Sequence, residues 1–213
     1  KITYAEQDKP RGLADAFILG KDFIKKDNVS LILGDNFFYG QNLSKELVNC
    51  AKLKKGAKVF LYKVTKPELY GVAKIGQKNK IIKIVEKPKK YISDYAITGI
   101  YFFDNRVVDY AKKLKPSKRG ELEITDLLKK YKKNNELSAN IISRGGAWLD
   151  TGSIDDYYKT TAFVSAIENR QGLKIACLEE IAYNYGWINK KQIKSQIQFY
   201  GNCDYSKYLK KII

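Results

Sequence analysis

The segment from Val29 to Asp35 places the strongest limit on the fold of this 213-residue chain. It is an apolar run that contains one serine and ends in a turn. A short run of this kind is typical of a strand that is buried on both faces. The segment from Leu13 to Ile24 carries apolar residues at helical spacing, and Ile2 to Gln7 has the pattern of a short strand. Strand, helix and strand in about 35 residues predict a βαβ unit with parallel strands and a right-handed crossover.

The remaining sequence continues this alternation of strand-like and helical segments. The strand-like segments are 57–64, 71–75, 80–85, 95–103, 137–142 and 147–150, and the helical ones are 43–51, 107–111, 121–133 and 154–171. Ser153 is placed to cap the last of these helices. No linker-like stretch divides the chain. We therefore expect one α/β domain over residues 1–213, with a mixed sheet and a helical C-terminal appendage over residues 173–213.

Composition narrows the class of protein. Lys and Arg number 40 against 23 for Asp and Glu, a formal net charge of +17, which raises the alternative of a nucleic-acid-binding domain. The excess is scattered Lys, and that alternative leaves Asp35, Glu86 and Asp150 without a role, so we expect no nucleic-acid partner. No apolar run is long enough to span a membrane. The odd number of cysteines and the absence of CxxC spacing predict free thiols in a reducing compartment rather than zinc ligands.

Two carboxylates fall where strands end, Asp35 after 29–34 and Asp150 after 147–149. Ligands of open α/β sheets bind outside the carboxyl ends of the strands. Mg²⁺ is commonly held by one or two carboxylates together with waters and substrate phosphates. The two residues are therefore candidate metal ligands, and the alternative is that each merely caps the turn that follows it.

Two further segments have the residue types of a binding site. Glu86-Lys87-Pro88 ends another strand-like segment, where Glu can accept hydrogen bonds from sugar hydroxyls and Lys can meet a phosphate. A surface ion pair at a hairpin end is the alternative. In the loop from Gln7 to Leu13, backbone N–H groups near Gly12 could point at an anion or a base edge. Neither GxxxxGK[ST] nor GxGxxG occurs.

Seven motifs in a fixed order make these signals specific. They are Pro10-Arg11-Gly12-Leu13-Ala14, Leu33-Gly34-Asp35-Asn36 with Phe38-Tyr39-Gly40, Tyr70-Gly71-Val72, Glu86-Lys87-Pro88, Tyr95-Ala96-Ile97-Thr98-Gly99, Arg119-Gly120-Glu121-Leu122-Glu123-Ile124-Thr125-Asp126 and Ala147-Trp148-Leu149-Asp150-Thr151-Gly152. Together they resemble the glucose-1-phosphate thymidylyltransferases, a family of sugar nucleotidyltransferases. The resemblance runs over the whole chain.

The resemblance implies a three-layer, Rossmann-like fold and a defined reaction. The family joins dTTP and α-D-glucose 1-phosphate into dTDP-glucose and pyrophosphate, with Mg²⁺, in the dTDP-rhamnose pathway. It also implies a cytoplasmic homotetramer with neither a nucleic-acid nor a membrane partner. This chemistry depends on positioning and charge neutralisation more than on a protein base, so the absence of His is no objection.

The resemblance also assigns residues to roles. Asp35 and Asp150 would hold Mg²⁺, and Lys87 would contact the phosphate of the sugar phosphate. Glu86, Tyr70, Gly71, Gly99 and Tyr101 would face the sugar, and Gln7, Gly12 and Leu13 the thymine and its deoxyribose. Tyr39, Gly40, Arg144 and Gly145 resemble part of a second, regulatory nucleotide site.

This sequence departs from the family pattern in one major respect. The family opens with a strand and a GGxGTRLxPxT loop that binds the triphosphate, whereas this chain begins at Lys1, in the segment that leads to the base-binding loop. We therefore expect a chain without the first βαβ portion of the fold and with little or no transferase activity alone. The alternatives are a uridylyl- or cytidylyltransferase on the same sugar phosphate, and a non-catalytic fragment that binds sugar nucleotides.

Overall fold

The computed structural model describes residues 2–213, apart from the side chain of Lys78. These residues group into two units, 1–150 and 151–213, and each is described by itself. The sequence places the start of the helical appendage at residue 173, whereas the contacts also group the helix over 154–171 with the C-terminal residues. That residues 1–213 form a single domain stays a prediction.

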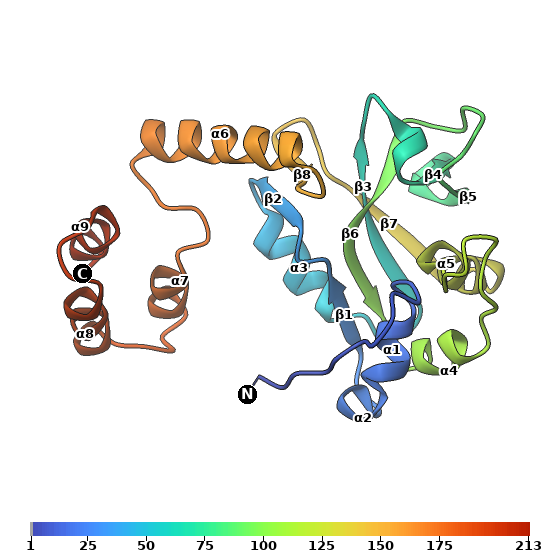
Figure 1. The fold of residues 1–213 in the computed structure, drawn as a ribbon, viewed down its shortest axis with the longest axis horizontal. Coiled ribbons are helices and arrows are strands. Elements are labelled where there is room, and N and C mark those ends of the chain that lie inside the picture. Colours follow the sequence, from blue (N-terminus) through green and yellow to red (C-terminus); the bar gives the residue numbers. More distant parts are fainter. Residues whose placement is uncertain (1) are drawn as a thin grey trace. The chain divides into compact units, whose positions relative to one another are not determined.

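A six-stranded mixed sheet around one long strand, β6 (Tyr95–Phe103), forms the centre of the first unit (Figure 1). Every residue of β6 except Tyr95 is buried, as its aromatic and β-branched composition predicts for a central strand. The strand order is β5-β4-β6-β3-β7, and β1 also pairs with β6. The other strands are β1 (Val29–Ile32), β3 (Ala57–Lys63), β4 (Gly71–Ile75), β5 (Ile81–Glu86) and β7 (Leu137–Ile141).

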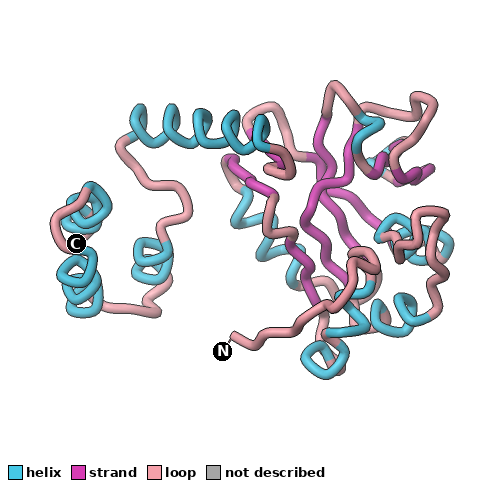
Figure 2. The backbone as a smooth tube through the Cα atoms, in the orientation of Figure 1, coloured by secondary structure: helices cyan, strands magenta, loops and turns pink. Residues whose placement is uncertain are grey.

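Helices cover both faces of this sheet, which gives the predicted three layers (Figure 2). The larger core packs α1 (Asp15–Leu19), α2 (Lys21–Ile24), α4 (Val107–Lys112) and α5 (Ile124–Lys133) against one face. On the other face, Cys50 of α3 (Leu43–Ala51) packs with Phe60 and Phe102. Short 3₁₀ turns, η1 (Pro67–Leu69) and η2 (Gln77–Asn79), precede β4 and β5. The α/β fold with a mixed sheet is therefore confirmed.

A separate two-stranded antiparallel ribbon joins distant parts of the sequence. It pairs β2 (Asn36–Gly40) with β8 (Gly146–Asp150), and the register sets Asn36 opposite Asp150 and Gly40 opposite Gly146. Because Asp35 directly precedes Asn36, this register brings the two predicted metal ligands to the same end of the ribbon. Figure 1 shows β2 and β8 side by side.

The βαβ unit predicted for the first 33 residues is wrong. Residues 2–7 form no strand and are exposed, and β1 pairs antiparallel with β6. A short apolar run reveals neither its partner nor its direction, because the same residues fit a parallel and an antiparallel ladder. Among the strand pairs described here, only β3 and β7 are parallel. The helical segment also divides into two short helices at Gly20.

The buried carboxylate of Asp104, directly after β6, connects this end of the sheet to α4 and α5. Asp104, which is 2% exposed, accepts hydrogen bonds from the Gly56 N–H at 2.6 Å, the Tyr131 hydroxyl at 3.0 Å and Arg106 Nε at 3.0 Å. Arg106 in turn donates to Glu136 at 2.7 Å. Burial is the largest influence on Asp104 and opposes its ionisation, but the hydrogen bonds together outweigh it and lower its pKa below the ordinary aspartate value.

The second unit consists of α6 (Ile154–Gln171), α7 (Leu178–Asn184), α8 (Lys190–Tyr200) and α9 (Asp204–Lys211), which confirms the helical C-terminal region. Ser153 caps α6 as predicted, because its hydroxyl accepts the Asp156 N–H at 3.1 Å. Cys177, Ile193 and Leu209 form a small core. None of the helices between residues 2 and 213 combines the length and the apolar character that crossing a membrane requires.

We expect Asp104→Ala to lower the free energy of unfolding of the first unit by about 3 kcal/mol at pH 7. The reason is that it leaves the buried Gly56 N–H and Tyr131 hydroxyl without an acceptor and removes one of the two carboxylates that pair with Arg106. Since the pKa of Asp104 is lowered, its stabilisation is present above the ordinary carboxyl pKa and is lost as pH falls through the folded-state value. The difference from the unaltered chain should therefore shrink below about pH 4.

The measurement is urea denaturation followed by the fluorescence of Trp148, in a Trp187→Phe background that leaves one tryptophan in the first unit. The exposed Asp109→Ala is the matched control. An equal and small loss in both variants at pH 7 would contradict the assignment of Asp104 as the anchor of this end of the sheet.

Candidate active site

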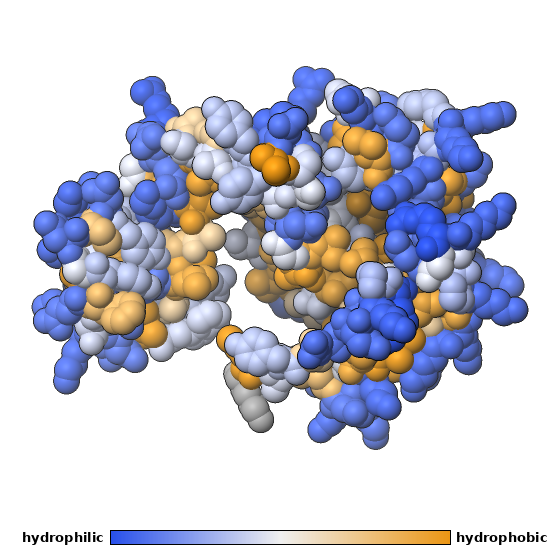
Figure 3. Space-filling model, viewed as in Figure 1, coloured by the Kyte–Doolittle hydropathy of each residue, from blue (hydrophilic) through white to orange (hydrophobic). Residues whose placement is uncertain are grey.

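A cavity of about 220 Å³ in the first unit collects most of the predicted site residues. Leu13, Asp35, Tyr70, Gly71, Glu86, Lys87, Gly99, Tyr101 and Asp150 line it. They come from the ends of β1, β5 and β8, the start of β4 and the middle of β6, except Leu13, which lies in the loop before α1. On the visible face of this unit, apolar side chains gather in the middle and hydrophilic ones surround them (Figure 3). The roles of these residues stay predictions, but the fold places them around one space.

The candidate metal ligands share a wall of this cavity. Asp35 lies between β1 and β2, Asp150 is the last residue of β8, and the pairing of Asn36 with Asp150 sets them close along the ribbon. Asn36 Nδ2 donates to Asp35 Oδ1 at 2.8 Å. Within residues 2–213, no cluster of three or more His, Cys, Asp or Glu side chains forms a cage for a metal. Two carboxylates beside an open cavity fit Mg²⁺, which retains waters and substrate oxygens as its other ligands.

Lys87 has an unusual backbone conformation. Its φ of 38° lies in the left-handed region, which a residue with a side chain adopts at a cost on the order of 1 kcal/mol. Its N–H donates to the Tyr70 carbonyl at 3.0 Å, and this bond fixes the end of β5 against the start of β4. Strained backbone of this kind concentrates at functional sites. The sequence contains no signal for it.

Glu86 is a carboxyl group with a raised pKa. Burial is the main cause and the charge of Glu123 adds to it, while Arg119, whose Nη1 lies 3.9 Å from Glu86 Oε1, offsets only part of the effect. Burial and the charge of Glu86 also raise the pKa of Tyr101, so its phenol stays protonated and can donate a hydrogen bond at neutral pH.

The charges around the cavity are unequal. The carboxylates that line it are Asp35, Glu86, Glu121, Glu123 and Asp150, and among the described residues its basic side chains are Lys87 and Arg119. Arg119 Nη2 is held by both oxygens of Glu121, at 2.8 and 2.9 Å. Such a lining favours cations and ligands rich in hydroxyl groups over an unaccompanied polyanion.

The predicted base-binding residues lie in an adjoining cavity of about 460 Å³, which Gln7 and Gly12 line and which shares Leu13 with the first cavity. Asp15, which the sequence analysis missed, accepts from Gln7 Nε2 at 2.7 Å and from Arg11 Nε at 3.1 Å. Buried at 4% exposure, it fixes the Gln7 amide. A helical apolar pattern gave no reason to assign a buried carboxylate there.

Gly12 permits a close backbone approach next to these residues. It has a φ of 100°, and a Cβ there would lie 2.7 Å from the backbone of Leu122. The Leu122 N–H donates to the Arg11 carbonyl at 2.7 Å, which joins the loop to the segment before α5. Glycine at this position therefore follows from a packing and conformational requirement.

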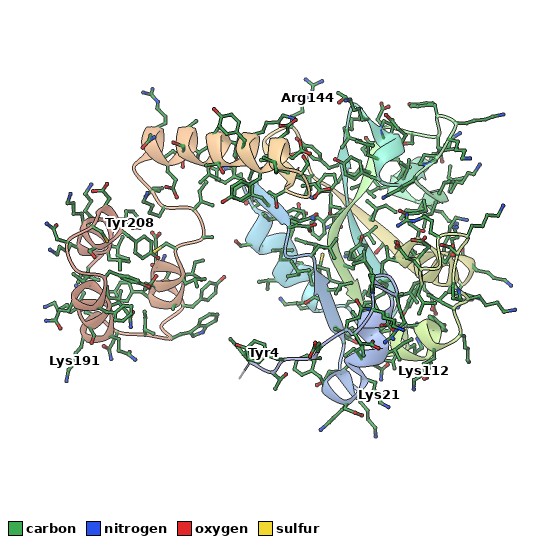
Figure 4. The ribbon with its side chains drawn as sticks, viewed as in Figure 1. Tyr4, Lys21, Lys112, Arg144, Lys191 and Tyr208 are labelled. Carbon is green, nitrogen blue, oxygen red and sulfur yellow. The ribbon has the colours of Figure 1, made fainter. Side chains whose placement is uncertain are left out.

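The predicted regulatory residues are not gathered in one cavity. Tyr39 and Gly40 line a small cavity of about 70 Å³, and Arg144 lines another of about 270 Å³ beside Lys63. Gly145 lines neither. Arg144 extends outward from the turn between β7 and β8 (Figure 4). A regulatory role for these residues stays a prediction.

The fold and the cavity together define a class of protein. The sequence pattern described as nucleotidyl transferase matches residues 1–166, and the chain belongs to that family. Its curated relatives include glucose-1-phosphate thymidylyltransferases. The protein of this name from Neisseria meningitidis serogroup A is 46% identical over 212 residues, which cover 100% of this chain and 74% of that protein. The Mycobacterium tuberculosis protein of this name is 41% identical, with 100% and 73% covered.

Solved structures agree with this assignment. A Bacillus anthracis structure described as a glucose-1-phosphate thymidylyltransferase aligns with a TM-score of 0.66 at 46% identity and covers 76% of this chain and 64% of that chain. UDP-glucose pyrophosphorylase with UDP-glucose aligns with a TM-score of 0.68 at 24% identity, over 77% of this chain and 66% of that one, which is a likeness of fold alone.

Because the pKa of Glu86 is raised in the folded chain, ionisation of Glu86 opposes folding once pH rises above the ordinary carboxyl pKa. We expect Glu86→Gln to match the unaltered chain in urea midpoint near pH 4. It should become the more stable of the two as pH rises, with the full difference above the folded-state pKa of Glu86. The Trp148 fluorescence assay measures this difference, and the exposed Glu68→Gln is the control. A variant that is less stable at pH 8 would contradict the burial argument.

Proposed function

We propose that this chain forms the sugar-phosphate and metal-binding part of an active site that makes dTDP-glucose and pyrophosphate from dTTP and α-D-glucose 1-phosphate. The observation that carries the proposal is the convergence of Asp35, Asp150 and the Glu86-Lys87 pair on one cavity. The names of the relatives at 41–46% identity support the choice of substrates. The UDP-glucose pyrophosphorylase structure, at 24% identity, is similar to this chain in fold alone.

In the proposed reaction, a phosphate oxygen of glucose 1-phosphate attacks the α-phosphorus of dTTP in line. A bond forms between that oxygen and the α-phosphorus, and the bond from the α-phosphorus to the bridging oxygen breaks, so that pyrophosphate leaves. The attacking phosphate is already ionised at neutral pH, so the step needs no protein base. Asp35 and Asp150 would hold Mg²⁺, which would neutralise part of the phosphate charge.

The chain's own side chains bind and orient the sugar phosphate. The Lys87 ammonium meets the phosphate as a point charge, and its strained backbone fixes the direction from which it does so. The Glu86 carboxylate accepts from sugar hydroxyls, and the protonated Tyr101 phenol donates to them. Orientation of this kind lowers the barrier by holding the attacking oxygen in line.

The balance of charges around the cavity limits how tightly this chain alone binds a nucleoside triphosphate. A triphosphate brings several negative charges into a cavity whose described lining has more carboxylates than basic side chains. Lys87 is assigned to the sugar phosphate, and Arg119 is engaged by Glu121. We therefore expect this chain to bind the sugar phosphate and to hold dTTP too weakly for turnover at family-like rates.

We also propose a homotetramer in the cytoplasm, within the dTDP-rhamnose pathway. Large apolar side chains stand exposed on the second unit, including Tyr158 at 74%, Leu178 at 73% and Phe199 at 80%, and subunit contacts would cover them. The three cysteines are unpaired, as a reducing compartment requires.

Calorimetric titration of the chain with glucose 1-phosphate in Mg²⁺ tests the proposed function. We expect saturable binding that Lys87→Ala weakens about tenfold or more, because a charge-assisted contact is lost. Asp35→Asn and Asp150→Asn should each remove the Mg²⁺-dependent part of the affinity. The exposed Lys89→Ala is the control for loss of positive charge near the site. Binding that is absent, or equal in all variants, would overturn the proposal.

Base choice and turnover are measured separately. We expect dTDP-glucose to bind more tightly than UDP-glucose and CDP-glucose, and the chain to release little or no pyrophosphate from dTTP and glucose 1-phosphate. A preference for UDP-glucose would favour the uridylyltransferase alternative. Family-like release of pyrophosphate would contradict the argument from charge.

A further inference from the structure

Asn36, the first residue of β2, makes three side-chain hydrogen bonds to three different parts of the first unit. Its Oδ1 accepts from the Gly99 N–H in β6 at 3.0 Å and from the Trp148 indole Nε1–H in β8 at 2.6 Å. Its Nδ2 donates to Asp35 Oδ1 at 2.8 Å. A single amide thus connects the sheet, the ribbon and a candidate metal ligand.

The chemistry of the partners fixes the orientation of this amide. A backbone N–H and an indole N–H can only donate, so the atom that both of them meet is the amide oxygen. The NH₂ group must then face the Asp35 carboxylate. Rotation of the amide by 180° would set its NH₂ against two donors and its oxygen against a carboxylate, and all three hydrogen bonds would be lost.

Gly99 provides the space for this arrangement. A Cβ at Gly99 would overlap the Asn36 amide and would lie 2.9 Å from Leu33 Cβ. Glycine inside a strand weakens it and commonly marks the close approach of another group. The resemblance placed Gly99 against the sugar; in the structure its N–H is used by Asn36.

We propose that Asn36 is a positioning residue that locates both candidate metal ligands at once. Its backbone pairs with Asp150 in the ribbon, and its side chain holds the Asp35 carboxylate in one orientation. The carboxylate pair is therefore arranged before a cation arrives, and binding need not order it. This inference rests on the proposed role of Asp35 and Asp150 as metal ligands.

The test measures Mn²⁺ affinity of the 213-residue chain by electron paramagnetic resonance, without nucleotide or sugar phosphate. We expect Asn36→Ala to weaken Mn²⁺ binding about tenfold or more, the range seen when a group that orients a metal ligand is removed. Phe38→Ala is the matched control, because Phe38 lies in the same strand and packs against the core formed by Cys50, Phe60 and Phe102. It loosens the ribbon without touching Asp35, and we expect a change in affinity below about threefold.

Equal losses in both variants, or no loss in Asn36→Ala, would overturn the inference, because the amide would then serve only the stability of the ribbon. Gly99→Ala leaves Asn36 in the chain but places a methyl group where its amide lies, and it supplies the same test if Asn36→Ala does not fold. Absence of Mn²⁺ binding in the unaltered chain overturns the proposed metal role itself, a result distinct from failure of the Asn36 argument.

Discussion

The antiparallel pairing of β2 with β8 is the constraint on which the site depends. The two strands are more than a hundred residues apart in sequence, yet their register sets Asn36 opposite Asp150 and so brings Asp35 to the same end of the ribbon. A shift of one residue would turn every side chain of one strand to the other face. The hydrogen bond between Asn36 and Trp148 crosses from β2 to β8 and opposes such a shift. The hydrogen bond between Asn36 and Gly99 joins the ribbon to β6.

Around that ribbon the cavity is built for a cation and a hydroxyl-rich ligand, although the chain as a whole has a net charge of +17. The basic excess is spread over the surface, where it can attract anions from solution. Among the charged residues of the described lining, carboxylates outnumber basic side chains, and Lys87 has a strained backbone conformation. In the proposed function, a phosphate group would lie beside a metal and one ammonium group, and Glu86 would face the sugar.

The sequence was sufficient to predict those features of the fold that depend only on neighbouring residues. The strand-like segments that correspond to β4 and β5 and the Ser153 cap of α6 were predicted, because apolar alternation and capping depend on neighbouring residues. The strand that pairs with β1 was not predicted, because a short apolar run does not determine which strand it pairs with. The candidate site residues were predicted through motifs, and their roles stay predictions. The burial of Asp15 and the φ of Lys87 leave no signal in the sequence, since both depend on the folded backbone.

The central claim is that Asp35 and Asp150 together bind one divalent cation. A crystal structure of the chain with Mn²⁺ and glucose 1-phosphate, with the metal located by its anomalous signal, tests it most directly. The account predicts one strong peak within bonding distance of an oxygen from each carboxylate, with the sugar's phosphate on the same ion. A peak bound by other residues, or a sugar phosphate seated in this cavity with no metal between the two carboxylates, would contradict it.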